Sequence, residues 1–592
     1  MFKFVCFFVF LFFSSSNFAL ENNLHKNKRQ EVFQEYIENG SILNHPKFGA
    51  FQVLAITWKF GCLNHSGYMS NILNKWDSKV SDVYVSEIFS LVALVRYVYQ
   101  FKECLSLDNL KTIEKSLERK RDYFSHGTIN HAIMQASSWY LMAQMFPNVV
   151  WTNSNNEKLS SREISERLKY KISNRLVSFN KNGFVEQLST TYFMLNFIPL
   201  LNIIDFSEDK NFKELVNDAA NNHLYFLRLH SFDGIIVAPY ARGNYQQTSS
   251  GINSANIPPA VSQQLLWLYF GSLSLGKSDF FNNNEPLYLV LPVLSRWEPN
   301  LSDIEFRKPY QVTSITPGFS YWGDKTDFEI VGRSSYFDGF AMGLGNFNFD
   351  PRSFNHDSQQ FSIVLKSEKL LNQIECYHPY WRSGLGENAW ARDRSSPFVQ
   401  GAVDWNRAVI FFDIPEKDPW VYSKDNVYFS YRVDRASSLF KFFQCRIPKD
   451  FDQVVIKNGS IYIREGSVFG LIYSLGGRWS MSDVFFEDNL DGYIVLKDYR
   501  SRGGVFFLLY ESETGENFSD FIVEAEKLVP DYSLGDLSVR WVNIFNKNVF
   551  VRFRDEYPAA GSRFKSIPDF KVDGHVVHDQ FDGYYKVQEG NK

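Results

Sequence analysis

The chain has 592 residues, a formal net charge of −4 and 22% charged residues, which is typical of a globular protein with two or more domains. The small negative charge and the lack of a long Lys/Arg run exclude the usual electrostatic footprint of a nucleic-acid-binding protein, so no nucleic-acid partner is expected. Aromatic residues reach 17%, which suits a protein that stacks rings against sugars.

Residues 1–19 are predicted to be a signal peptide. A positively charged start, Met1-Phe2-Lys3, precedes an apolar core from Phe4 to Phe13 that is too short to anchor a mature protein in a bilayer, and cleavage is expected near Ala19. No later stretch approaches the roughly 18 uninterrupted apolar residues of a membrane helix. We therefore expect no membrane span and export to the periplasm or the cell exterior.

Four cysteines remain in the mature chain: Cys62, Cys104, Cys376 and Cys445. In an exported protein, either Cys62 is bridged to Cys104 or all four stay buried and free. Their spacing is not that of a zinc site, and no essential cysteine chemistry is expected.

The mature chain shows two different patterns of apolar residues, one typical of helices and one typical of strands. This division predicts a multidomain α and β protein. Residues 20–285 show apolar residues three and four apart, typical of about nine helices, and predict an incomplete (α/α) toroid of helical hairpins that forms the catalytic domain. Residues 286–308 are predicted to be a connector. Residues 309–592 alternate between short apolar segments and Gly, Asn and Asp turns, which predicts a large antiparallel β-sandwich domain.

The stretch from His126 to Pro147 predicts a helix that is apolar on nearly every face and therefore buried on both sides. Thr128 is a candidate N-cap, and Pro147 follows the last apolar turn. Asn130 and His131 then lie in the first turn, at the rim of the space that the helices enclose. The alternative is that the two residues only cap or pack the helix end.

A second stretch, from Gly183 to Phe197, predicts another apolar helix that begins at Ser189, with Tyr192 in its first turn. Tyr192 follows His131 by 192 − 131 = 61 residues, about two connecting helices with their loops, so the two residues can share one rim. Glu186 lies just ahead of this helix and has ordinary uses as a cap or an Arg partner. For Tyr192 the alternative is a core aromatic whose hydroxyl is satisfied.

Two further stretches carry polar candidates. Tyr240 and Arg242 lie in a loop bounded by Gly and Pro, where an Arg either clamps a carboxylate or makes a surface ion pair. His356 and Asp357 directly precede a β segment and are a structural pair, a fragment of a metal site or part of a cleft floor.

Together these motifs resemble the polysaccharide lyases built from a toroid and a sandwich, and most of all the heparinase II/III-like and oligoalginate lyase group. HGTINHAIMQASSWYLMAQMFP is similar to their Gly-Thr-Glu-Asn-His segment, EQLSTTY to their Glu-x-x-Ser-x-x-Tyr, and NHDSQQFSIVLKSEKLL to the opening of their β domain. The resemblance spans His126 to Leu371 by motif. Two positions depart from it: Ile129 stands where relatives often have Glu, and Asn355 replaces a second His, which removes a ligand from a zinc site in the β domain.

The resemblance implies cleavage of an acidic polysaccharide at a uronic acid by β-elimination. Asn130 and Arg242 would neutralise the uronate carboxylate, with Glu186 and Tyr240 also binding substrate. Tyr192 and His131 would carry protons, because a helix N-terminus favours a phenolate and a neutral imidazole. In the β domain His356 ranks first as a further proton carrier, ahead of Tyr310, Tyr336 and Tyr380. No cofactor is expected to be required, a structural divalent metal in the β domain stays open, and the oligomeric state is undetermined.

Three alternatives stay open. A toroidal glycoside hydrolase needs two carboxylates across a cleft, for which Glu186 and Asp233 are the best pair. A uronyl epimerase shares the proton abstraction and then reprotonates the sugar. A non-catalytic glycan-binding protein would keep the aromatic residues and dispense with Asn130, His131 and Tyr192.

Overall fold

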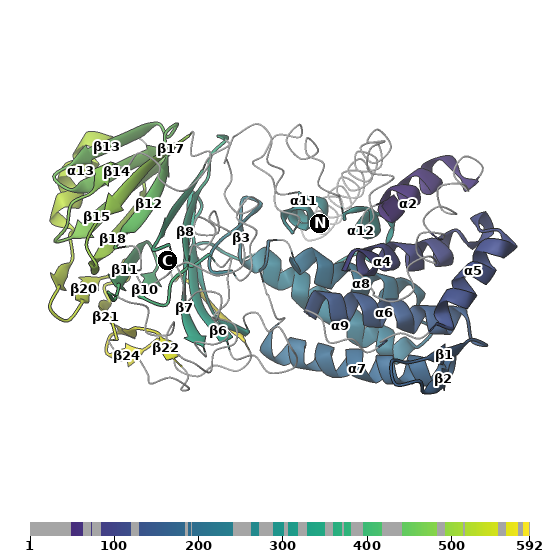
Figure 1. The fold of residues 1–592 in the computed structure, drawn as a ribbon. Helices are drawn as coiled ribbons and strands as arrows, with labels where there is room; N and C mark the ends of the chain where they lie inside the picture. The colour runs from purple at the N-terminus through teal and green to yellow at the C-terminus, as the bar shows by residue number, and fades with distance from the viewer. Residues whose placement is uncertain are drawn as a thin grey trace, which may run out of the picture.

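The computed structural model describes residues 49–62, 73, 85–119, 123, 129–183, 188–190, 192–240, 262–271, 288–300, 306–317, 328–349, 359–369, 372–379, 395–416, 441–481, 492–512, 516–554, 564–577 and 584–590. The expected signal peptide lies outside these ranges and stays a prediction. Helices occupy the first half of the chain and strands the second, and the two halves lie side by side (Figure 1). None of the described helices is both long enough and apolar enough to cross a membrane.

The described part of the first half is mainly α-helical, as the apolar spacing predicted. Its described helices are α2 (Gly49–Phe60), α4 (Val85–Gln100), α5 (Leu107–Leu117), α6 (Ile129–Met145), α7 (Ser161–Asn182), α8 (Tyr192–Phe206), α9 (Lys210–Leu229), α11 (Gln263–Phe270) and α12 (Val290–Leu294), with a short 3-10 turn, η3 (Lys102–Cys104). Two small hairpins join them: β1 (Val150–Thr152) with β2 (Lys158–Ser160), and β3 (Ser231–Phe232) with β4 (Ile235–Ile236).

Helices α6 and α8 form the centre of this half. In α6, 14 of 17 residues are buried, which confirms the two-sided burial predicted for it, and in α8, which was predicted to be apolar, 11 of 15 are buried. A helix with apolar residues on every face removes them from water only by packing against other elements on several sides. Accordingly α6 contacts α4, α7 and α8, and α8 also contacts α9.

Helices α7 and α9 are amphipathic and cover this centre from outside. Each begins at a polar cap: Ser160 and Glu163 form a capping box at α7, and Asp209 accepts from the Phe212 N–H at 3.0 Å. Paired helical layers of this kind are the unit from which a toroid is built. Closure of a ring stays a prediction.

The segment expected as a connector contributes to the helical core. Val290–Leu294 form α12, and Tyr288, Leu289 and Trp297 are buried with it. The Trp297 ring meets Phe197 of α8 edge-on, with 5.5 Å between ring centroids. Packing with the helices therefore continues as far as Trp297.

The second half contains three antiparallel sheets within the described ranges. The ten-stranded sheet comprises β5 (Tyr310–Pro317), β6 (Phe328–Tyr336), β7 (Phe340–Phe349), β8 (Phe361–Leu365), β9 (Gln373–Tyr377), β12 (Phe443–Pro448), β16 (Ser480–Met481), β17 (Tyr493–Asp498), β22 (Phe564–Ser566) and β25 (Tyr585–Glu589). The six-stranded sheet comprises β10 (Val399–Asp404), β11 (Arg407–Asp413), β13 (Gln453–Lys457), β14 (Ser460–Glu465), β15 (Val468–Leu475) and β18 (Arg502–Glu511). The five-stranded sheet comprises β19 (Asp531–Ser533), β20 (Ser538–Val542), β21 (Asn548–Arg552), β23 (Asp569–Val572) and β24 (His575–Val576).

These sheets are stacked, as the alternating pattern predicted. Phe361 of the ten-stranded sheet and Phe507 of the six-stranded sheet meet at 4.6 Å in the core between them. The opposite face of the six-stranded sheet is covered by the five-stranded sheet and by one helix, α13 (Phe518–Lys527). The six-stranded sheet is therefore buried on both faces, which explains why its central strands are apolar throughout.

The helical half packs against the outer face of the ten-stranded sheet. Leu229 at the end of α9 and the β3–β4 hairpin share an apolar cluster with Tyr310 and Tyr336 of the sheet. Beyond the hairpin the backbone lies so close to the sheet that a Cβ on Gly343 would be 1.7 Å from the Ala238 carbonyl oxygen. Only glycine fits this position, and the contact fixes the two halves to each other.

Two disulfides join the four cysteines. Cys62 is bonded to Cys104, which confirms the bridged alternative for that pair, and Cys376 is bonded to Cys445. The second bond was not expected, and the alternative of four free thiols is wrong. Cys376 and Cys445 lie directly opposite each other on β9 and β12, a relationship that depends on strand pairing and that sequence spacing does not reveal. Disulfides of this kind are typical of oxidising compartments.

Candidate functional site

The first turn of α6 carries Asn130 and His131, as predicted. Asn130 is fully buried, whereas the His131 side chain keeps part of its surface exposed. The His131 ring meets Phe89 of α4 edge-on, with 5.7 Å between centroids. This contact packs the imidazole against α4. Thr128, the candidate N-cap, lies outside the described residues.

The first turn of α8 carries Tyr192, also as predicted. The Ser189 hydroxyl accepts a hydrogen bond from the Tyr192 N–H at 2.9 Å, which confirms Ser189 as the cap. Ser262, just before α11, donates from its hydroxyl to the Ser189 carbonyl at 2.8 Å. The Tyr192 side chain packs partly against the helical core and is not fully buried.

Helices α6 and α8 run parallel, so their first turns lie at the same end. Near their last turns, the Gln144 side-chain amide donates to the Phe206 carbonyl at 2.9 Å. Gln144 follows His131 by 144 − 131 = 13 residues, and Phe206 follows Tyr192 by 206 − 192 = 14. At about 1.5 Å per residue both intervals correspond to roughly 20 Å of helix. His131 and Tyr192 therefore lie at matching heights on neighbouring helices.

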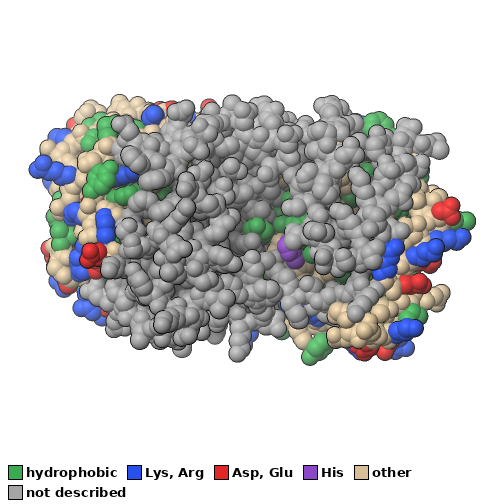
Figure 2. Space-filling model, viewed as in Figure 1, with side chains coloured by type: hydrophobic (Ala, Val, Ile, Leu, Met, Phe, Trp, Pro, Cys, Tyr) green, Lys and Arg blue, Asp and Glu red, His purple; other side chains and the backbone are tan. Residues whose placement is uncertain are grey.

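This end of the helices faces the β half. Helix α9 runs antiparallel to α8, because His223 in its second half stacks on Phe193 at 3.5 Å. From the end of α9 the chain passes directly onto the ten-stranded sheet, where Tyr240 and Gln359 exchange backbone hydrogen bonds of 3.2 and 3.0 Å. Figure 2 shows a hollow in the middle of the molecule, where apolar side chains and one histidine side chain are visible between the two halves.

Three candidate tyrosines, Tyr240, Tyr310 and Tyr336, are buried. Tyr240 is 1% exposed, and Tyr310 and Tyr336 stack at 4.6 Å inside the apolar cluster that joins the halves. Burial raises the pKa of Tyr310 and of Tyr336 well above the ordinary value, so both phenols hold their protons. Their surroundings suit packing between the halves.

The other expected site residues lie outside the described residues: Glu186, Arg242, His356, Asp357 and Tyr380. Their roles stay predictions. Asp233, the second carboxylate of the hydrolase alternative, lies in the turn between β3 and β4, and burial raises its pKa. A carboxyl group of this kind favours its protonated form more than an exposed one does.

Two buried histidines were not singled out from the sequence. His223 in the second half of α9 and His230, the C-cap of that helix, are fully buried, and desolvation lowers the pKa of each to about 3. Both imidazoles are therefore neutral at physiological pH. His223 falls on the apolar stripe of α9 with Val216, Ala219 and Leu227, and that spacing was the signal available in the sequence.

Within the described ranges, one group of side chains has metal-ligand spacing, namely Cys62, Glu103 and Cys104. Its two sulfurs are joined in a disulfide, so they are not available as thiolate ligands.

The residues at this site are of types that can transfer protons. An imidazole and a phenol, each at the positive end of a helix, are placed on adjacent helices opposite a sheet. An amide beside the imidazole adds a neutral hydrogen-bonding group.

No family model matches the sequence, and no curated protein matches it. Among solved structures, the chain is similar to heparan sulfate lyase HepC from Pedobacter heparinus, with 11% identity and a TM-score of 0.37 over 89% of this chain and 82% of that one. A mutant of the same lyase matches with 10% identity and a TM-score of 0.38 over 89% and 82%. Heparinase III matches with 9% identity and a TM-score of 0.39 over 91% and 82%.

Proposed function

We propose that the chain is a polysaccharide lyase that cleaves a uronic-acid-containing polysaccharide by β-elimination. The observation that carries the proposal is the position of His131 and Tyr192 at one end of two parallel, buried helices that face the β half. Two groups that can hold or release a proton are thereby brought to one site from positions 61 residues apart. The motif resemblance points to the same pair.

The reaction needs a base, an acid and a means of neutralising charge. The base removes the proton on carbon 5, alpha to the carboxylate, and the bond between carbon 4 and the glycosidic oxygen breaks. The electron pair left behind forms a double bond between carbons 4 and 5, and the leaving oxygen takes up a proton. Without a neutralised carboxylate the intermediate would carry two adjacent negative charges, so electrostatic stabilisation is the main requirement.

Proton transfer is assigned to His131 and Tyr192, because both keep side-chain surface outside the core. The positive end of α8 favours a phenolate at Tyr192, which suits a base that later returns its proton to the leaving oxygen. His131 is the second proton carrier, and the positive end of α6 favours its neutral form. His356 from the β half is the third candidate.

Carboxylate neutralisation is assigned to Asn130 and Arg242, with Glu186 and Tyr240 as further substrate contacts. Asn130 and Tyr240 are 0% and 1% exposed, so a direct contact with substrate requires their side chains to become accessible. Export through the predicted signal peptide completes the proposal and agrees with the two disulfides.

The test is ultraviolet absorbance across a panel of uronic-acid polymers, which detects the unsaturated uronate product. We expect a rise on at least one polymer, lost in Tyr192→Phe and strongly reduced in His131→Gln. Tyr170→Phe is the matched control, because Tyr170 is 70% exposed on α7 and outside the site.

Each outcome has a distinct meaning. Full activity in Tyr192→Phe would overturn the assignment of the base. New reducing ends without absorbance would indicate hydrolysis, and exchange of the carbon 5 proton with solvent without chain cleavage would indicate an epimerase. Binding without any reaction, unchanged by the variants, would indicate a glycan-binding protein.

A further inference from the structure

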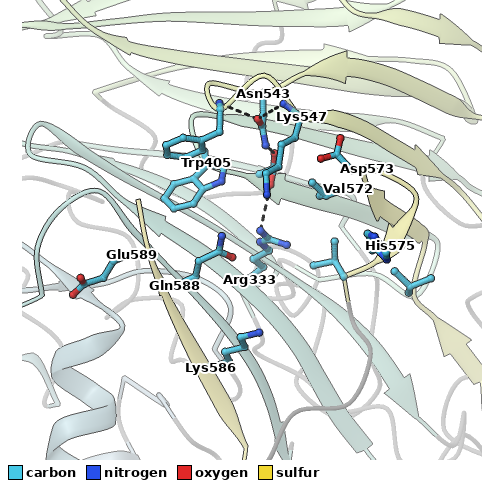
Figure 3. Close-up of a pocket in the computed structure, with 14 residues that line it drawn as sticks. Arg333, Trp405, Asn543, Lys547, Val572, Asp573, His575, Lys586, Gln588 and Glu589 are labelled. Carbon is cyan, nitrogen blue, oxygen red and sulfur yellow. Dashed lines mark hydrogen bonds and ion pairs between the residues drawn. The ribbon is translucent and has the colours of Figure 1, made fainter. Parts of the chain in front are cut away.

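The β half contains a cavity of about 410 Å³ that the proposed reaction does not use (Figure 3). Residues from all three sheets line it: Arg333, Asp404, Trp405, Asn543, Phe545, Lys547, Val572, Asp573, His575, Val576, Val577, Lys586, Gln588 and Glu589. None of these described lining residues belongs to the helical half. The volume lies in the usual range for small-molecule sites.

Arg333 of β6 forms the floor of this cavity and is held rigidly. Its Nη2 donates to Gln311 Oε1 at 2.5 Å and to Asp404 Oδ1 at 3.2 Å, and its guanidinium carbon lies 5.1 Å from the centroid of the Phe570 ring. The side chain is only 7% exposed. Of its three nitrogens, Nη2 alone donates hydrogen bonds within the described part of the chain, so the group retains donors beyond those that fix it.

The partners of Arg333 are themselves fixed. Asp404 Oδ2 accepts from the Asn543 side-chain amide at 2.8 Å, and Asn543 Oδ1 accepts from the Phe545 and Lys547 N–H groups at 2.9 and 3.0 Å. One chain of hydrogen bonds thus connects the three sheets around the cavity, as Figure 3 shows. A ligand would meet preformed groups, which lowers the entropic cost of binding.

Two exposed ammonium groups and two exposed carboxylates surround this floor. Lys547 and Lys586 line the cavity and make no ion pair within the described ranges. Asp573 and Glu589 line it as well. Because Arg333 and Asp404 already pair, the formal charges of the other four side chains cancel. Such a lining offers ammonium donors to one carboxylate and carboxylate acceptors to hydroxyl groups, and it lacks the excess of positive charge that a polyanion needs.

Trp405 and Phe545 supply an apolar wall. Their rings meet edge-on at 4.7 Å, and Trp405 has a φ of +56°, a left-handed conformation that is rare for a bulky residue. The following residue, Asn406, holds the turn by exchanging hydrogen bonds of 2.9 Å with Leu509. A strained residue of this kind persists where the surrounding structure fixes it, and such residues cluster at ligand-binding sites.

We propose that this cavity binds an acidic sugar residue, a pyranose that carries a carboxylate. The carboxylate lies toward Arg333, Lys547 and Lys586. The hydroxyl groups donate to Asp573 and Glu589, and the apolar face of the ring packs on the wall formed by Trp405 and Phe545. The site is separate from His131 and Tyr192, so it holds acidic polysaccharide at a second point whether or not the chain cleaves it.

The test is lysine acetylation of the full-length Tyr192→Phe protein, with each lysine quantified by mass spectrometry. The probes are a short oligoglucuronate and a neutral gluco-oligosaccharide of the same length. With oligoglucuronate at about ten times its Kd, we expect Lys547 and Lys586 to react about tenfold more slowly. Lys449, exposed in the turn after β12 and outside the cavity, is the control and should react at an unchanged rate.

Variants provide a second readout that does not depend on turnover. Lys586→Gln and Lys547→Gln should each weaken oligoglucuronate binding measured by calorimetry about tenfold, whereas Lys449→Gln should not change it. Unchanged labelling of Lys547 and Lys586, equal protection by the neutral sugar, or equal protection by inorganic sulfate would each overturn the proposal. The labelling and calorimetry results do not depend on lyase activity. The proposed lyase activity and the proposed acidic-sugar site can therefore be refuted independently of each other.

Discussion

The Ser189 hydroxyl accepts a hydrogen bond from the Tyr192 N–H, with 2.9 Å between Oγ and N, and so sets the phenol in the first turn of α8. The capping residue Ser189 and the candidate base Tyr192 therefore belong to the same helix turn. Ser189 is itself fully buried and held by Ser262, so the turn cannot shift without disturbing α11.

Removing this cap should affect both stability and turnover. We expect Ser189→Ala to lower the free energy of unfolding by about 1 kcal/mol, because the Tyr192 N–H loses its acceptor. Turnover should fall about tenfold or more, since small displacements of a reacting group are costly. Ser160→Ala removes the equivalent cap of α7 on the exposed surface and is the control. A similar stability loss with normal turnover in both variants would separate the cap from catalysis.

A buried ion pair joins α4 to α8. Arg96 donates to Asp205 at 2.6 Å and to the Asn202 side chain at 2.8 Å, and its own side chain is fully buried. Arg96→Met leaves the Asp205 carboxylate without its cation and should cost about 3–5 kcal/mol of unfolding free energy. The exposed Arg162–Glu166 pair offers the comparison, because Arg162→Met removes an ion pair in solvent and should have little effect on the unfolding free energy. Equal losses in denaturant melts would contradict this reading.

The buried histidines predict loss of stability in acid. The pKa of His223 is lowered from 6.5 to about 3, chiefly by desolvation. The unfolded chain therefore takes up a proton that the folded protein does not, and the unfolding free energy falls as pH drops from 6.5 toward 3. The slope should approach about 1.4 kcal/mol per pH unit for each such ring.

Replacing the ring tests this origin directly. His223→Gln should make the denaturant midpoint depend less on pH between pH 7 and 5. The decrease in slope should correspond to one fewer proton taken up on unfolding. Replacement of an exposed histidine, His575→Gln, should leave the slope unchanged. An identical slope in the wild type and in His223→Gln would show that other groups cause the acid sensitivity.

Contact between the two halves depends on Gly343. A Cβ at this position would be 1.7 Å from the Ala238 carbonyl oxygen and 2.7 Å from the Ser334 hydroxyl. Gly343→Ala should therefore destabilise the junction by about 1–3 kcal/mol or more, measured by thermal melting. Gly535→Ala is a suitable control because a Cβ there would meet its nearest neighbour at 3.7 Å. Equal melting temperatures of the two variants would show that the close approach is absent in solution.

The two disulfides should differ in their resistance to reduction. Cys376 and Cys445 are 1% and 0% exposed between paired strands, whereas Cys62 and Cys104 are only partly buried. Under mild reductant without denaturant, alkylation followed by mass spectrometry should label Cys62 and Cys104 first. Labelling of Cys376 and Cys445 at the same rate would mean that the sheet opens as readily as the helical surface.

Much of the fold was predictable because its signals are local. Local sequence patterns, each set by residues close together in the chain, indicated the apolar faces of α6 and α8, the cap at Ser189 and the strands after residue 309. The pairing of Cys376 with Cys445 and the cavity around Arg333 were not predictable, because both depend on how distant strands are ordered in the sheets. The burial of Asn130 and Tyr240 is likewise a tertiary property that residue type does not reveal.

The elimination that we assign to Tyr192 and His131 can be tested directly on its product. The most direct measurement is the mass of the first product released from a uronate oligosaccharide by the wild type and by Tyr192→Phe. We expect the wild type to release a product whose new non-reducing end lacks the elements of water, and Tyr192→Phe to release none. A product with water added, or the eliminated product at normal yield from Tyr192→Phe, would contradict this assignment.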